Sequence, residues 1–146
     1  MADQSCILLI EARYYEDIAD AMAEGAIQSI ETKGGFTVKR MAVPGVFEVP
    51  AAVNFVNLSE NSYAGIVALG CVIRGETDHY KHVCREASRA LMDLSVQDKI
   101  ALGFGILTCD TQQQAKERAA VGGRNKGAEA AQACLRMIEV KQSYQS

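Results

Sequence analysis

Several short segments of the chain are apolar throughout, and they constrain the fold more than any other feature. Residues 6–11 (CILLIE), 65–71 (GIVALGC) and 100–107 (IALGFGIL) have the length of strands and almost no polar alternation. Strands of this kind are buried on both faces, which is typical of parallel sheets covered by helices. Residues 36–43 (FTVKRMAV) have the alternating, β-branched character of another strand. These segments predict a mainly four-stranded parallel sheet.

Helical patterns separate these strands, as parallel pairing requires. After the first strand, apolar side chains recur at helical spacing up to a pair of glycines, which indicates a helix and its end. Further helices are predicted to begin near Pro50 and His79, and to span residues 111–120 and 125–141. The alternation predicts a three-layer α/β sandwich, and the length predicts one domain over residues 1–146.

Composition and charge exclude several classes of partner. The chain has 15 Lys and Arg against 18 Asp and Glu, so it lacks the basic surplus that drives binding to nucleic acid. The apolar run at residues 7–10 is too short for a signal-peptide core or a membrane span. Five cysteines without a CxxC pair indicate free thiols in a reducing compartment. We therefore expect a cytoplasmic protein that binds neither nucleic acid nor membrane.

The loop after the third predicted strand is the first candidate site, because ligands of parallel α/β sheets bind outside the carboxyl ends of the strands. Residues 72–79 (VIRGETDH) combine a glycine turn with a helix start, where backbone N–H groups and Thr77 can bind a phosphate. Capping of the helix by Thr77 or Asp78 is the alternative. His79 is suited to proton transfer near neutral pH, and a solvated surface histidine is the competing interpretation.

Other loops hold further candidates. Glu48, within residues 43–50 (VPGVFEVP), can accept hydrogen bonds from a polyol or amine, or can favour the dipole of the next helix. Tyr14 can offer an aromatic face to a flat heterocycle or pack in its loop. Arg118 can clamp a phosphate or remain solvated. Residues 125–127 (NKG) indicate a turn that opens the last helix.

Metal binding and thiol catalysis receive little support. His79 and His82 share a helical face, but no HExxH motif and no convergent set of ligands accompanies them. Cys84 lies on the apolar stripe of its helix and not in the loop, so it is poorly placed as a nucleophile. We predict no metal site.

Together the motifs resemble those of the lumazine synthase family in order and spacing, from Ile7 to about Ile138. The matching segments are residues 43–50 (VPGVFEVP), 70–80 (GCVIRGETDHY), 104–108 (FGILT) and 117–127 (ERAAVGGRNKG). The resemblance implies a flavodoxin-like topology, a homopentamer and, as in some members, a larger icosahedral capsid. It also implies catalysis without a metal or an organic cofactor.

The resemblance implies a transferase of riboflavin biosynthesis. The family condenses 5-amino-6-(D-ribitylamino)uracil with 3,4-dihydroxy-2-butanone 4-phosphate, giving 6,7-dimethyl-8-ribityllumazine, phosphate and water in the penultimate step of the pathway. Imine formation, phosphate elimination and ring closure gain chiefly from holding the reactants side by side, with modest acid–base help.

The resemblance also implies the role of each site residue. His79 would shuttle protons, and Glu76, Thr77 and Arg118 would bind the phosphate. The residues expected to bind the ribitylaminouracil are Tyr14, Val46, Phe47, Glu48, Cys71, Val72, Ile73, Phe104 and Lys126. Phe104, Arg118 and Lys126 would come from the neighbouring subunit, so the site would need an oligomer.

Some features depart from the family, and rival functions remain open. Tyr14 stands where relatives often have phenylalanine or tryptophan, and residues 120–124 (AVGGR) differ from the usual turn. An archaeal-type riboflavin synthase is disfavoured by Thr77 and His79. A flavin- or lumazine-binding shell protein without catalysis is disfavoured by His79 and Arg118. A generic flavodoxin-like FMN binder is disfavoured because no Ser/Thr-rich loop follows the first strand.

Overall fold

A computed structural model describes residues 3–58 and 63–144 of the chain. Within these residues, parallel strands form one sheet in the order β2-β1-β3-β4. The strands are β1 (Asp3–Ala12), β2 (Thr37–Val43), β3 (Tyr63–Ile73) and β4 (Leu102–Cys109). This order is that of the first strands in the flavodoxin-like arrangement. The predicted sheet and topology are therefore confirmed.

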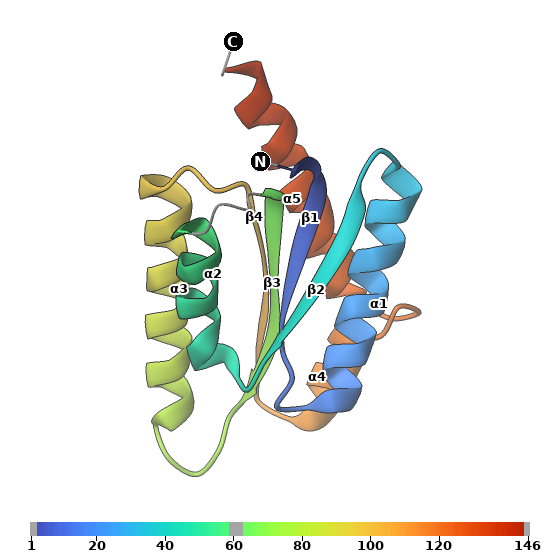
Figure 1. Ribbon diagram of the computed structural model, residues 1–146. Helices are drawn as coiled ribbons and strands as arrows, with labels where there is room; N and C mark the ends of the chain where they lie inside the picture. The colour runs from blue at the N-terminus through green and yellow to red at the C-terminus, as the bar shows by residue number, and fades with distance from the viewer. Residues whose placement is uncertain (1–2, 59–62, 145–146) are drawn as a thin grey trace.

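Helices cover both faces of the sheet, as Figure 1 shows. The helices on one face are α1 (Glu16–Lys33), α4 (Gln112–Ala119) and α5 (Lys126–Ser143). Those on the other are α2 (Val49–Leu58) and α3 (His79–Gln97), with the short 3-10 helix η1 (Val46–Glu48) leading into α2. The three-layer sandwich is confirmed. No helix in the described part of the chain has the length and apolar character needed to cross a membrane.

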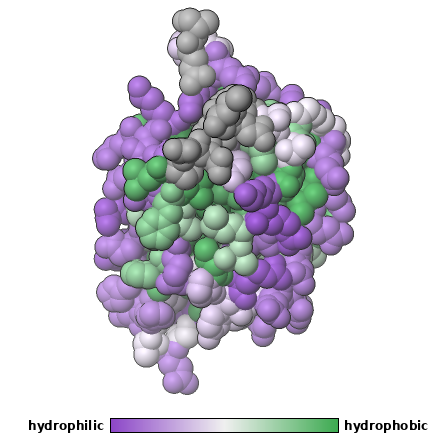
Figure 2. Space-filling view, viewed as in Figure 1, coloured by the Kyte–Doolittle hydropathy of each residue, from purple (hydrophilic) through white to green (hydrophobic). Residues whose placement is uncertain are grey.

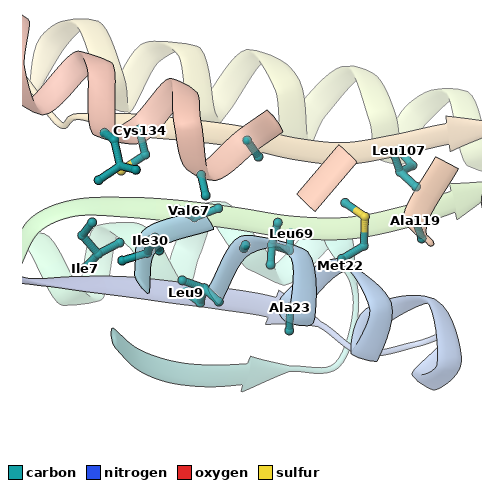
Figure 3. Close-up of a cluster of buried hydrophobic side chains, with 14 of the residues drawn as sticks. Ile7, Leu9, Met22, Ala23, Ile30, Val67, Leu69, Leu107, Ala119 and Cys134 are labelled. Carbon is teal, nitrogen blue, oxygen red and sulfur yellow. The ribbon is translucent and has the colours of Figure 1, made fainter. Parts of the chain in front are cut away.

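Two apolar clusters fill the spaces between the layers and explain why the strands lack polar alternation. Leu9 packs toward α1 and α5, whereas its neighbour Leu8 packs toward α2 and α3, and both are fully buried. Figure 3 shows the first cluster, in which Met22 of α1 lies beside the sheet residue Leu69 and Ile30 of α1 lies nearer Val67. Each fully buried side chain of this size contributes about 1.5–3 kcal/mol to folding.

The observed boundaries differ slightly from the predicted ones because burial and strand pairing do not coincide. The sequence predicts a strand over residues 100–107, whereas β4 begins at Leu102 and continues to Cys109 opposite Ile73 of β3. Ala101 is buried although it precedes the strand. An apolar run therefore marks where the chain is covered, and the hydrogen-bonded ladder sets where the strand ends.

Candidate active site

The loops at the carboxyl ends of β1, β2 and β3 surround a cavity of about 600 Å³. The predicted site residues that line it are Tyr14, Val46, Phe47, Glu48, Cys71, Val72, Ile73, Thr77 and His79. Glu76 is exposed on the same loop but is not part of the lining. One end of the sheet thus brings together residues that are distant in the sequence, as the strand-end rule predicts.

An ion-pair network holds the loop that carries Tyr14. Arg13 donates from Nη1 to Glu11 at 2.7 Å and from Nη2 to Asp20, and its backbone N–H bonds to Val43 at 3.1 Å. The hydrogen bond to Asp20, followed by that to Glu11, raises the pKa of Arg13. With the backbone fixed beside it, Tyr14 stays 74% exposed at the mouth of the cavity. Its ring is therefore available for stacking on a ligand.

The helix η1 places Val46, Phe47 and Glu48 against the end of the sheet. Val46 is buried, whereas Phe47 is 63% exposed on the cavity side. The close approach depends on Gly70 of β3, because a Cβ there would lie 2.7 Å from Cγ2 of Val46. Within the described residues, the Glu48 carboxylate has no hydrogen bond or ion pair, so its oxygens can accept bonds from a ligand.

Thr77 caps the start of α3 and leaves its own hydroxyl proton free. Its Oγ1 accepts a hydrogen bond from the backbone N–H of His79 at 3.3 Å, while Asp78 occupies the N-cap position of α3 without a side-chain cap. A hydroxyl oxygen that accepts one bond still has its own proton to donate. Thr77 can therefore cap α3 and donate to an anion in the cavity. The His79 side chain is exposed beside it.

The cysteines near the cavity are suited to packing and not to nucleophilic catalysis. Burial, with a smaller effect of Cys109, raises the pKa of Cys71 to about 12. Cys71 is therefore a neutral thiol at neutral pH, and a thiol attacks far more slowly than a thiolate. Cys84 Sγ lies 3.4 Å from the hydroxyl of Thr108. In the described residues, no group of three or more His, Cys, Asp or Glu side chains is placed to hold a metal ion.

Phe104, Arg118 and Lys126 lie elsewhere, in a separate pocket of about 380 Å³ formed by β4, α4 and α5. The linings of the two pockets share no residue. In the second pocket Arg118 donates from Nη1 to Sγ of Cys109, and Lys126 pairs with Glu129 at 3.1 Å. A single chain thus does not bring these three residues to His79.

The structure adds cavity residues that the sequence analysis did not assign to the site. Tyr15, Tyr80 and Val83 line the cavity, as do His82 and Glu86 one and two turns beyond His79. The sequence suggested His82 as a metal ligand or as a partner of Cys84, and not as part of this cavity. The i, i+3 and i+7 spacing of His79, His82 and Glu86 was the available signal, because it places all three on one face of a helix.

Comparison with known proteins gives a consistent result over most of the chain. The sequence pattern of the family described as 6,7-dimethyl-8-ribityllumazine synthase matches residues 4–142. A protein of that name from Bartonella tribocorum is 46% identical, covering 94% of this chain and 91% of its own length. The proteins of that name from Nitrobacter winogradskyi and Methylobacterium radiotolerans are 48% and 50% identical to this chain. Each match covers 92% of this chain, and it covers 85% of the first relative and 81% of the second.

Proposed function

The chain belongs to the 6,7-dimethyl-8-ribityllumazine synthase family, and we propose that it catalyses the condensation that the family name describes. The substrates are 5-amino-6-(D-ribitylamino)uracil and 3,4-dihydroxy-2-butanone 4-phosphate, and the products are the lumazine, phosphate and water. The observation that carries the proposal is the cavity at the strand ends. An aromatic ring, a carboxylate, a hydroxyl and an imidazole line it together, from Tyr14, Glu48, Thr77 and His79.

The cavity suits the ribitylaminouracil in shape and chemistry. The exposed rings of Tyr14 and Phe47 provide apolar faces for the flat pyrimidine. Glu48 accepts hydrogen bonds from the ribityl hydroxyls, since an ionised carboxylate is an acceptor only. The backbone at the end of β3, from Cys71 to Ile73, binds the polar edge of the ring. These contacts hold the 5-amino group next to the second substrate.

The phosphate of the second substrate binds at the start of α3. Thr77 donates its hydroxyl proton, and the first-turn N–H groups and the helix dipole favour a negative charge there. Glu76 contributes through its backbone N–H, because its carboxylate would repel the phosphate. Arg118 of a neighbouring subunit completes the site with its fork of donors.

His79 moves protons between the reacting groups. The 5-amino group attacks the ketone carbon, and the resulting carbinolamine loses water to give an imine. His79 takes a proton from the attacking nitrogen and returns one to the departing oxygen, because an imidazole can both accept and donate a proton. Loss of a proton and of phosphate from the butanone part then gives an enol that becomes a ketone. The ribityl-bearing nitrogen attacks this ketone carbon, and loss of a second water closes the ring. Holding both substrates in contact supplies most of the acceleration.

We also propose that the active site is shared between subunits of a homopentamer, which in turn can build a larger capsid. Two observations support this. The predicted residues occupy two separate pockets of one chain. Apolar side chains also gather over α2 on the face shown in Figure 2, where Phe55 is 69% and Leu58 is 76% exposed. A monomer rarely leaves such a patch uncovered. The free thiols of all five cysteines suit the cytoplasm as its location.

The direct test mixes the purified protein with both substrates and follows lumazine absorbance together with released phosphate. We expect lumazine and phosphate to form in equal amounts, and faster than in the spontaneous reaction. Folded protein that gives no acceleration with intact substrates would refute the enzyme assignment. Sedimentation of the same sample measures the assembly, and a fully active monomer would refute the shared site.

A further inference from the structure

Gln114, in the first turn of α4, makes a contact that neither the motifs nor the proposed chemistry uses. Its Oε1 accepts a hydrogen bond from the backbone N–H of Asp110 at 2.8 Å. The same oxygen lies 3.4 Å from Nη1 of Arg118, four residues further along the helix. Because a backbone N–H can only donate, it requires the oxygen of the carboxamide at this position. The orientation that serves Asp110 therefore also presents an acceptor to Arg118.

A purely structural role, in capping α4, is the alternative explanation for the contacts of Gln114. Thr111 is the N-cap of α4, and its hydroxyl accepts a bond from the backbone N–H of Gln114 at 3.2 Å. Together with the bond that Gln114 accepts from the backbone N–H of Asp110, this resembles a capping box, which stabilises a helix start. Capping alone, however, does not involve Arg118. The two roles can be separated because Thr111 takes part only in the cap.

The contacts of Arg118 restrain its guanidinium group on one side only. Its Nη1 is shared between Oε1 of Gln114 and Sγ of Cys109, each at 3.4 Å. In the described part of the chain, Nε and Nη2 have no hydrogen-bond acceptor. One corner of the planar guanidinium is thus held, and the remaining donors are available for a bidentate contact with a phosphate.

We propose that Gln114 is a positioning residue for phosphate binding, which holds the Arg118 guanidinium in the orientation that receives the butanone phosphate. The proposal rests on the proposed function, in which Arg118 binds this phosphate for the neighbouring active site. It predicts an effect on one substrate only. The pyrimidine contacts a different set of side chains, so its binding should not depend on Gln114.

The test uses steady-state kinetics and thermal unfolding of the assembled protein. Gln114→Met keeps the length of the side chain but removes the strong acceptor. Gln113→Met is the matched control, because Gln113 is exposed on the same helix and makes no side-chain hydrogen bond within the described residues. Thr111→Ala removes the other half of the cap. Gln114→Ala, which favours a helix, replaces the methionine variant if that variant folds poorly.

We expect Gln114→Met to raise the KM for the butanone phosphate about fivefold, the order expected for the loss of one ordinary hydrogen bond. The KM for the pyrimidine and the kcat should stay within about twofold. Gln113→Met should match wild type, and Thr111→Ala should lower Tm without changing either KM. In an Arg118→Ala background, Gln114→Met should have no further effect on KM, because its partner is absent.

The outcomes distinguish the proposal from the function it rests on. If Gln114→Met lowers Tm as Thr111→Ala does but leaves KM unchanged, the residue only caps α4 and the proposal is wrong. An equal rise in KM with and without Arg118 also overturns it. If wild type makes no lumazine, or if Arg118→Ala leaves the KM for the butanone phosphate unchanged, the proposed function or the role of Arg118 is wrong, and the positioning role falls with it.

Discussion

For His79, a role in proton transfer can be tested separately from a role in substrate binding. It lies exposed at the cavity, where it can exchange protons with a bound substrate. We predict that His79→Ala lowers kcat about tenfold, less than the ~100-fold often lost with a general acid or base, because proximity of the reactants is retained. Both KM values should change little. Steady-state rates across pH 5 to 9 measure the effect, and an unchanged kcat would remove His79 from proton transfer.

The buried thiol of Cys134 predicts a loss of stability at high pH. Burial raises its pKa to about 12 from an ordinary value of 9.0. Above pH 9 the unfolded chain releases this proton while the folded protein keeps it. The free energy of unfolding therefore falls as pH rises toward 12, by up to about 1.4 kcal/mol per pH unit. Below pH 9 the contribution is fully present.

Urea unfolding between pH 8 and 10.5 measures this dependence. Cys134→Ala should be less stable at pH 8 because it leaves a small cavity, but its stability should fall less steeply with pH. Cys84→Ala is the control, since Cys84 is only half-buried and should keep the slope of wild type. Equal slopes for wild type and Cys134→Ala would contradict the assignment.

The close contact between helices α1 and α5 requires a glycine at position 127. Gly127 of α5 lies against α1, where a Cβ would come within 2.1 Å of the carbonyl oxygen of Met22. Gly127→Ala should therefore force the helices apart and cost roughly 1–3 kcal/mol, the range for an overpacked core. Gly122→Ala, with nothing within 4 Å, is the matched control. Urea midpoints measure both, and equal midpoints would show that α1 and α5 are not packed as described.

Elements with strong periodicity were predictable, and those set by tertiary contact were not. Ile18, Met22, Ala26 and Ile30 are all buried, as the helical spacing predicts for α1. The helix η1 spans only 3 residues, too few to show a period, and its position depends on Gly70. Local patterns report the environment of each element, whereas close approaches between elements depend on the whole fold.

The candidate site, too, was predictable from the sequence only in part. The loops at the strand ends were predicted to converge, and the structure places Tyr14, Glu48 and His79 around one cavity. The separation of Arg118 from this cavity had no local signal, because the distance between two surfaces depends on how β4, α4 and α5 pack. The family resemblance, and not the residue pattern, suggested that a second subunit would supply it.

At the scale of the whole molecule, the proposed function places two half-sites on one chain. The cavity with His79 and the pocket with Arg118 have separate linings, so in the proposed ring each half would meet its complement on the next subunit. A homopentamer of this kind would contain active sites only between subunits. The chemistry and the assembly would therefore be lost together.

Complementation between two impaired variants, assayed at a butanone phosphate concentration well below the KM of the Arg118 variant, tests this claim most directly. One chain carries Glu48→Ala with His79→Ala, and the other carries Arg118→Ala, so each keeps one half-site intact. The two variants are refolded together in equal amounts. By chance, about a quarter of the interfaces in a ring then combine an intact cavity with an intact Arg118 pocket. We predict that lumazine formation rises to about a quarter of the wild-type rate, well above either variant alone. A mixed assembly no more active than the average of the two separate variants would contradict a site shared between subunits.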